Sequence, residues 1–176
     1  RGNNLNFVID GSLPKFLIDG SIKDVPAYIV MPQCPANTTW ESFAPTVKEL
    51  IDFMVVNKKI SPKKISLTGH SLGGSGTWSL AASYPNTFSC IAPLSGSVSV
   101  SKASTYVGFP VWAFVGSADT VVDPASSQNI VPLINTAGGN AQLKVYAGAS
   151  HFEVADLAYK DQNLKLLDWL IGKSRN

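Results

Sequence analysis

Short apolar runs alternate with amphipathic segments from about residue 25 onward. Most of the apolar runs are unbroken, which is typical of parallel strands that are buried on both faces. The pattern predicts five strands, which are Ala27–Met31, Lys64–Thr68, Cys90–Leu94, Val111–Val115 and Gln142–Tyr146. Strands that alternate with helices predict an α/β fold, with a mostly parallel sheet and helices on both of its faces.

The segments between these strands carry helix signals. Helices are predicted over Phe43–Val55, from Ser71 to near Tyr84, over Asp123–Gly138 and over Leu164–Gly172, with a short one at Leu13–Leu17. Pro85 ends the second helix because proline cannot continue it. Pro132 lies inside the third, where it predicts a kink or an early break.

One strand-to-helix junction carries a nucleophile motif. Residues 69–73 read Gly-His-Ser-Leu-Gly, between a predicted strand and a predicted helix. In that context Gly-x-Ser-x-Gly holds a serine on a strained turn with its hydroxyl above the sheet. We expect Gly69 and Gly73 to be required because side chains there would clash with nearby backbone. The motif predicts Ser71 as a nucleophile and the Leu72 N–H as an oxyanion donor at a helix start.

A serine hydroxyl needs a base, and the chain has two histidines. His70 adjoins Ser71, but the turn displays only its central residue. We therefore expect His70 to pack against neighbouring side chains or to support the catalytic residues indirectly. His151 follows the last predicted strand, at the sheet edge where ligands meet parallel sheets. His151 is therefore the predicted base.

The orienting acid is expected after the strand that lies between these two residues. Asp119 and Asp123 both follow Val111–Val115. Asp123 precedes Pro124 and has a sufficient role as a helix cap, whereas Asp119 has no such role and lies closer to the strand end. We therefore expect Asp119 to orient His151.

Composition narrows the function further. The 176 residues, 45% hydrophobic and 15% charged, suit one domain over residues 1–176. A net charge of +2 indicates no nucleic-acid partner, and no apolar run approaches the ~20 residues that span a membrane. Two cysteines and two scattered histidines predict no metal site, and no organic cofactor is implied. The sequence does not establish the localisation; it slightly favours a cytoplasmic protein and does not exclude a secreted one.

Several segments carry a family resemblance. They are Met31–Pro35 with Trp40, Leu67–Trp78, Tyr84–Pro85, Ile91–Gly96, Pro110–Asp119 and Asp168–Leu170. As an ordered set they resemble bacterial esterases of the phospholipase/carboxylesterase and "predicted peptidase" type, within the α/β-hydrolase fold. The resemblance implies a serine carboxylic-ester hydrolase, supports Ser71, Asp119 and His151, and implies a small-molecule or carbohydrate-linked ester as substrate.

The beginning of the chain departs from that family. Arg1–Asn4 resembles the segment directly after the family's His-Gly oxyanion motif, yet the motif and the strand before it are absent. We therefore expect a longer natural protein, with the N-terminal strands of the full fold missing here. A gap or another chain's peptide would then lie between Ala27–Met31 and Lys64–Thr68. Direct pairing of those two strands in a five-stranded sheet would contradict this expectation.

Two other functions stay open at this point. The same triad could serve a thioesterase or a peptidase, and an incomplete oxyanion site would favour a catalytically silent binding domain. Trp40 and Phe152 are candidates for pocket walls, with core packing as the alternative for each.

Overall fold

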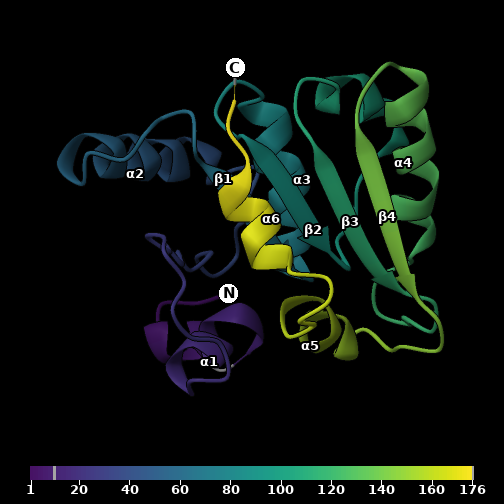
Figure 1. Cartoon of the computed structure of the whole chain (residues 1–176), viewed down its shortest axis with the longest axis horizontal. Coiled ribbons are helices and arrows are strands. Elements are labelled where there is room, and N and C mark those ends of the chain that lie inside the picture. Colours follow the sequence, from purple (N-terminus) through teal and green to yellow (C-terminus); the bar gives the residue numbers. More distant parts are fainter. Residues whose placement is uncertain (10, 176) are drawn as a thin grey trace.

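A computed structural model describes residues 1–9 and 11–175, and they form a four-stranded parallel sheet. The strands lie side by side in chain order: β1 (Ser66–His70), β2 (Cys90–Leu94), β3 (Val111–Gly116) and β4 (Ala141–Tyr146). Helices cover both faces of the sheet (Figure 1). The predicted α/β fold with a parallel sheet is confirmed.

The prediction of a fifth strand at Ala27–Met31 is wrong. This segment is irregular, and the side chains of Tyr28 and Val30 are exposed. Among the described residues no hydrogen bond joins it to β1, which forms an edge of the sheet. A strand exists only where a neighbour pairs with its N–H and C=O groups, and an apolar run does not reveal that neighbour. The five-stranded arrangement with direct pairing to β1 is therefore not found.

The two faces of the sheet bury separate hydrophobic clusters. The first cluster combines one face of the sheet with residues of α2 (Ala44–Asn57), α3 (Leu72–Ser83), the 3-10 helix η2 (Val100–Tyr106) and α4 (Ala125–Thr136). The second combines the other face with residues of α1 (Ser12–Ile18), α5 (Glu153–Tyr159) and α6 (Leu166–Gly172). Successive residues of β2 alternate between the clusters, with Ile91 in the first and Cys90 and Ala92 in the second. The sheet is thus the middle of three layers.

All five predicted helices are present, and the structure differs from the prediction in two respects. α4 continues through Pro132 to Thr136, so the expected early break does not occur. Ile130, Val131 and Ile134 flank the proline and are buried, and at about 1.5–3 kcal/mol each their burial outweighs the ~3 kcal/mol cost of a helical proline. α5 was not predicted, and η1 (Leu5–Val8) and η2 are further short elements.

Candidate active site

Ser71 occupies a strained turn between β1 and α3. Its φ of 58° and ψ of −117° lie in a backbone region that residues other than glycine rarely adopt. A hydrogen bond to the neighbouring strand stabilises the turn, because the Ser71 N–H donates to the Leu94 carbonyl of β2 at 2.9 Å. Leu72 is the first residue of α3, so its N–H has no acceptor within the helix and faces outward at the helix start.

The glycines around Ser71 have different structural roles. A Cβ on Gly69 would lie 2.6 Å from the carbonyl carbon and oxygen of Gly73, which agrees with the expectation for Gly69. A Cβ on Gly73 would meet nothing within 4 Å, so the steric reason expected for Gly73 is wrong. The close approach lies one residue later, where a Cβ on Gly74 would overlap the Leu94 carbonyl oxygen.

Asp119 lies in the loop after β3 and is fully engaged in hydrogen bonds. Its Oδ1 accepts from the Val121 and Val122 N–H groups, each at 2.9 Å, and its Oδ2 lies 2.8 Å from Nδ1 of His151. Burial opposes the charged form, but these bonds, led by the one from Val122, outweigh it and lower the pKa of Asp119. The carboxylate is therefore ionised and oriented toward His151.

His151 lies in the loop between β4 and α5, which contacts the Asp119 loop directly. The Ala118 N–H donates to the Ala149 carbonyl at 3.0 Å, and the Gly148 N–H donates to Ser117 Oγ at 2.8 Å. The side chain of His151 is 2% exposed and that of Asp119 is 1% exposed. The other ring nitrogen of His151, Nε2, has no hydrogen-bond partner among the described residues.

The structure separates the two candidate acids. Asp123 is exposed, and its Oδ1 accepts from the Ala125 N–H at 2.9 Å at the start of α4. It thus has the capping role that the sequence indicated. Ser71 and His151 both lie at the carboxyl edge of the sheet, but within the described chain the Ser71 hydroxyl forms no hydrogen bond to His151. Sequence reasoning missed the donors Val121 and Val122, because backbone N–H groups leave no residue-type signal.

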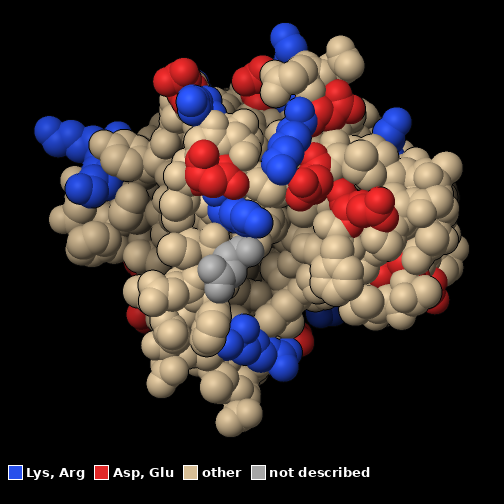
Figure 2. All heavy atoms as spheres, turned by 90° about the horizontal axis from the view of Figure 1, so that it is seen from below, with Lys and Arg blue, Asp and Glu red and all other residues tan. Residues whose placement is uncertain are grey.

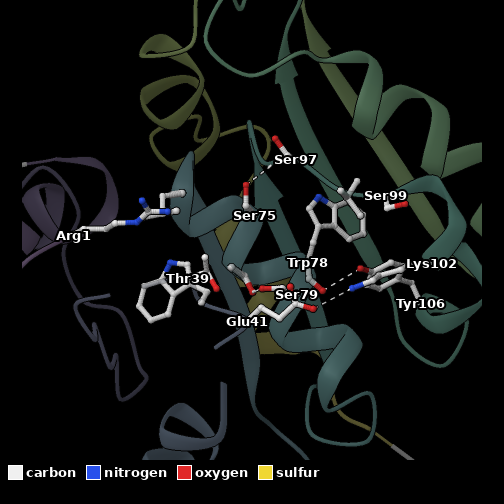
Figure 3. A pocket seen from close by; sticks show the side chains of 14 residues that line it. Arg1, Thr39, Glu41, Ser75, Trp78, Ser79, Ser97, Ser99, Lys102 and Tyr106 are labelled. Carbon is white, nitrogen blue, oxygen red and sulfur yellow. Dashed lines mark hydrogen bonds and ion pairs between the residues drawn. The ribbon is translucent and has the colours of Figure 1, made fainter. Parts of the chain in front are cut away.

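A cavity of about 370 Å³ lies beside α3 (Figure 3), and Leu72, the residue after Ser71, is part of its lining. Hydroxyl groups and indole rings make up much of its wall, from Thr39, Trp40, Ser75, Trp78, Ser79, Ser97 and Ser99. At its edge, Nζ of Lys102 lies 3.6 Å from Oε1 of Glu41. Trp40 lines this cavity and also packs against the first hydrophobic cluster, so both interpretations of Trp40 apply. Phe152 is 76% exposed and borders a second cavity of about 480 Å³ with His70.

Charged side chains and possible metal ligands do not gather at one place among the described residues. On the face seen in Figure 2, acidic and basic side chains lie interspersed, and Lys160 pairs with Asp156 at 2.8 Å. Over residues 1–9 and 11–175, no cluster of three His, Cys, Asp or Glu side chains could hold a metal ion. Within the same residues, no helix is long and apolar enough to cross a membrane.

The chain matches the family model described as "Dienelactone hydrolase family" over residues 27–164. The chain belongs to the dienelactone hydrolase family. The matched region contains Ser71, Leu72, Asp119 and His151. Membership in the dienelactone hydrolase family agrees with the predicted α/β-hydrolase fold.

Individual relatives lie at low identity. A crystal structure of a thermostable esterase superimposes with a TM-score of 0.76 at 27% identity, over 82% of this chain and 43% of that one. Protein usf of Aquifex pyrophilus is 25% identical over 105 residues, 59% of this chain and 46% of that protein. Poly(3-hydroxyalkanoate) depolymerase C of Paucimonas lemoignei is 36% identical over 59 residues, 34% of this chain and 14% of the depolymerase. The chain spans less than half the length of each, so the activity of this dienelactone hydrolase family member is a proposal.

Proposed function

We propose that the protein hydrolyses carboxylic esters through an acyl-enzyme formed on Ser71. The observation that carries the proposal is the buried hydrogen bond between Asp119 and His151, at the same sheet edge as the strained Ser71 turn. An imidazole oriented by an ionised carboxylate beside a displayed serine suits nucleophilic acyl transfer. Family membership and the likeness to a thermostable esterase support the same reaction class.

In the proposed reaction His151 acts first as a base and then as an acid, while Ser71, Asp119 and Leu72 have one role each. The Ser71 oxygen attacks the ester carbonyl carbon while its proton passes to Nε2 of His151, and Asp119 stabilises the resulting imidazolium. The oxyanion of the tetrahedral intermediate accepts a hydrogen bond from the Leu72 N–H. The intermediate then expels the alcohol, which takes the proton from His151. Water attacks the acyl group by the same sequence and frees Ser71.

The substrate is proposed to be a small-molecule or carbohydrate-linked ester. The cavity beside α3 is lined in part by the proposed oxyanion donor Leu72 and is large enough for a substituent of the ester. Its hydroxyl groups offer hydrogen bonds, its indole rings offer apolar faces, and Arg1, Glu41 and Lys102 add charged groups to the lining, a combination that suits an oxygen-rich group. We place the larger part of the ester there.

Hydrolysis of p-nitrophenyl acetate by Ser71→Ala, His151→Ala and Asp119→Asn tests the mechanism. We expect turnover to fall by at least about 10³-fold in the first two variants, because nucleophile and base act as a unit. Near-wild-type turnover in either would contradict it. A fluorophosphonate probe is expected to label Ser71, whereas an unlabelled wild type would indicate a silent binding domain. Parallel rates on ester, thioester and amide substrates separate an esterase from a thioesterase or a peptidase.

A further inference from the structure

His70, the residue before Ser71, contacts the loop of His151 directly. Its Nε2 lies 2.9 Å from the backbone carbonyl oxygen of His151, which is 81 positions away in the sequence. A carbonyl oxygen can only accept, so Nε2 of His70 carries the proton and donates it. The two imidazole rings lie 4.8 Å apart between centroids. The end of β1 is thus joined to the loop after β4 immediately behind the candidate site.

His70 is well placed to act as a rigid anchor. It is half-buried at the end of β1, where it pairs in register with Leu94 of β2. Burial lowers the pKa of His70 and outweighs the opposite effect of the His151 carbonyl, so the ring is neutral. A neutral ring keeps the N–H donor without placing a positive charge beside the imidazole that must itself become charged.

The His70 and Asp119 bonds constrain different parts of His151. Asp119 holds Nδ1 of the ring, whereas His70 holds the backbone carbonyl. The preceding residue is held as well, because the Ser150 N–H and hydroxyl both donate to Glu153 Oε2. With the backbone and one ring nitrogen fixed, the orientation of the ring, and so the direction of Nε2, is fixed as well. If the backbone moved, the ring would have to tilt to keep its bond to Asp119.

We propose that His70 is a positioning residue whose Nε2–H anchors the His151 backbone, so that the His151 ring stays aligned with Asp119 and Ser71. As far as turnover is concerned, this inference rests on the proposed ester hydrolysis. The alignment of the His151–Asp119 bond does not depend on it.

Four variants test the anchor. His70→Gln keeps an N–H donor at about the position of Nε2, His70→Asn is too short to reach the carbonyl, and His70→Leu has no donor. Tyr159→Phe is the matched control, because the Tyr159 hydroxyl bonds Thr68 Oγ1 at 2.6 Å and so also joins β1 to the segment after His151. Thr68 itself donates to the Ala92 carbonyl at 2.7 Å, so the control removes one partly buried hydrogen bond away from the site. The readouts are the low-field proton NMR signal of His151 Nδ1–H, kcat and KM for p-nitrophenyl acetate, and Tm.

The expected pattern separates positioning from packing. In His70→Asn and His70→Leu the Nδ1–H signal broadens or shifts and kcat falls about 10-fold or more with KM little changed, since a ~1 Å misplacement can cost up to ~10²-fold. His70→Gln restores most of the Nδ1–H signal and most of kcat, whereas Tyr159→Phe lowers Tm and leaves the other two unchanged. An unchanged signal in folded His70→Asn would overturn the proposal, as would equal losses in the Asn and Gln variants. A wild type that hydrolyses no ester would overturn the proposed function, while the NMR signal would still decide the role of His70.

Discussion

Nδ1 of His151 lies 2.8 Å from Oδ2 of Asp119, in a pair of side chains that are almost completely buried. The two residues are 32 positions apart, on loops that follow β3 and β4. Those loops are themselves joined by the Ala118 N–H, which donates to the Ala149 carbonyl. A Cβ on Gly116 would overlap that same carbonyl oxygen, so the loops approach as closely as the backbone allows. The carboxylate therefore cannot turn away from the imidazole without a rearrangement of both loops.

Asp119 and Asp123 provide a matched pair of variants. We expect Asp119→Asn to lower kcat by up to about 10⁴-fold while the protein stays folded, because an amide no longer selects the imidazole tautomer with Nδ1–H. We expect Asp123→Asn to retain turnover and to change stability by only a few tenths of a kcal/mol, since asparagine also caps helices well. Steady-state kinetics and Tm measure the two effects. The reverse ranking in turnover would mean that Asp123 is the acid.

Asp119 also gives stability a defined pH dependence. Its pKa in the folded state lies below its usual value of 3.8, so its ionised form stabilises the fold above about pH 4. That contribution is lost as the pH falls through the lowered pKa. We expect the unfolding free energy of wild type minus that of Asp119→Asn, from urea titrations, to decrease steadily between about pH 5 and pH 2. A difference that grows toward acid would contradict the assignment of Asp119 as the hydrogen-bonded carboxylate.

Gly73 and Gly74 differ sharply although they are adjacent in the first turn of α3. We expect Gly74→Ala to lower the unfolding free energy by about 1–3 kcal/mol, because the new methyl group overlaps the Leu94 carbonyl oxygen and approaches the Gly96 Cα at 3.0 Å. Gly73→Ala has open space and is expected to be neutral or to stabilise by up to ~1 kcal/mol, since alanine favours a helix over glycine. Denaturant midpoints compare the two variants. Equal losses of unfolding free energy would show that the close approach at Gly74 does not restrict the residue type there.

The cavity beside α3 predicts a size-dependent effect on KM. Ser79 lines this cavity, so Ser79→Phe is expected to raise KM about 10-fold for a bulky p-nitrophenyl ester and to leave the acetate unaffected. Ser83→Phe is the control, because Ser83 lies one turn further along α3 and is exposed. Parallel losses on both esters, or a similar effect of the control, would mean that the substrate does not enter this cavity.

Local signals made much of the architecture predictable. Pro85 follows the end of α3, and the residues from Phe43 to Val55 fall within α2 or at its N-cap, because helix ends and amphipathic faces depend on residues a few positions apart. The setting of the Ser71 turn was equally local, since strand, pentapeptide and helix are contiguous. Their positions after strands identify Ser71, Asp119 and His151 as candidates from the sequence. Their catalytic roles stay predictions, while the bond between Asp119 and His151 is a structural finding.

The sequence by itself thus determined the alternation of strands and helices, the strained serine turn and the candidate residues after the strands. Only the tertiary structure decided that Ala27–Met31 forms no strand, that Gly74 rather than Gly73 makes the close approach, and that His70 bonds the His151 carbonyl. Each of these depends on atoms that lie far apart in the chain: a neighbouring strand, the Leu94 carbonyl, or a loop 81 residues away. Hydrogen bonding and steric contact act over a few ångströms in space, whatever the separation along the chain, so residue type and spacing alone do not reveal them.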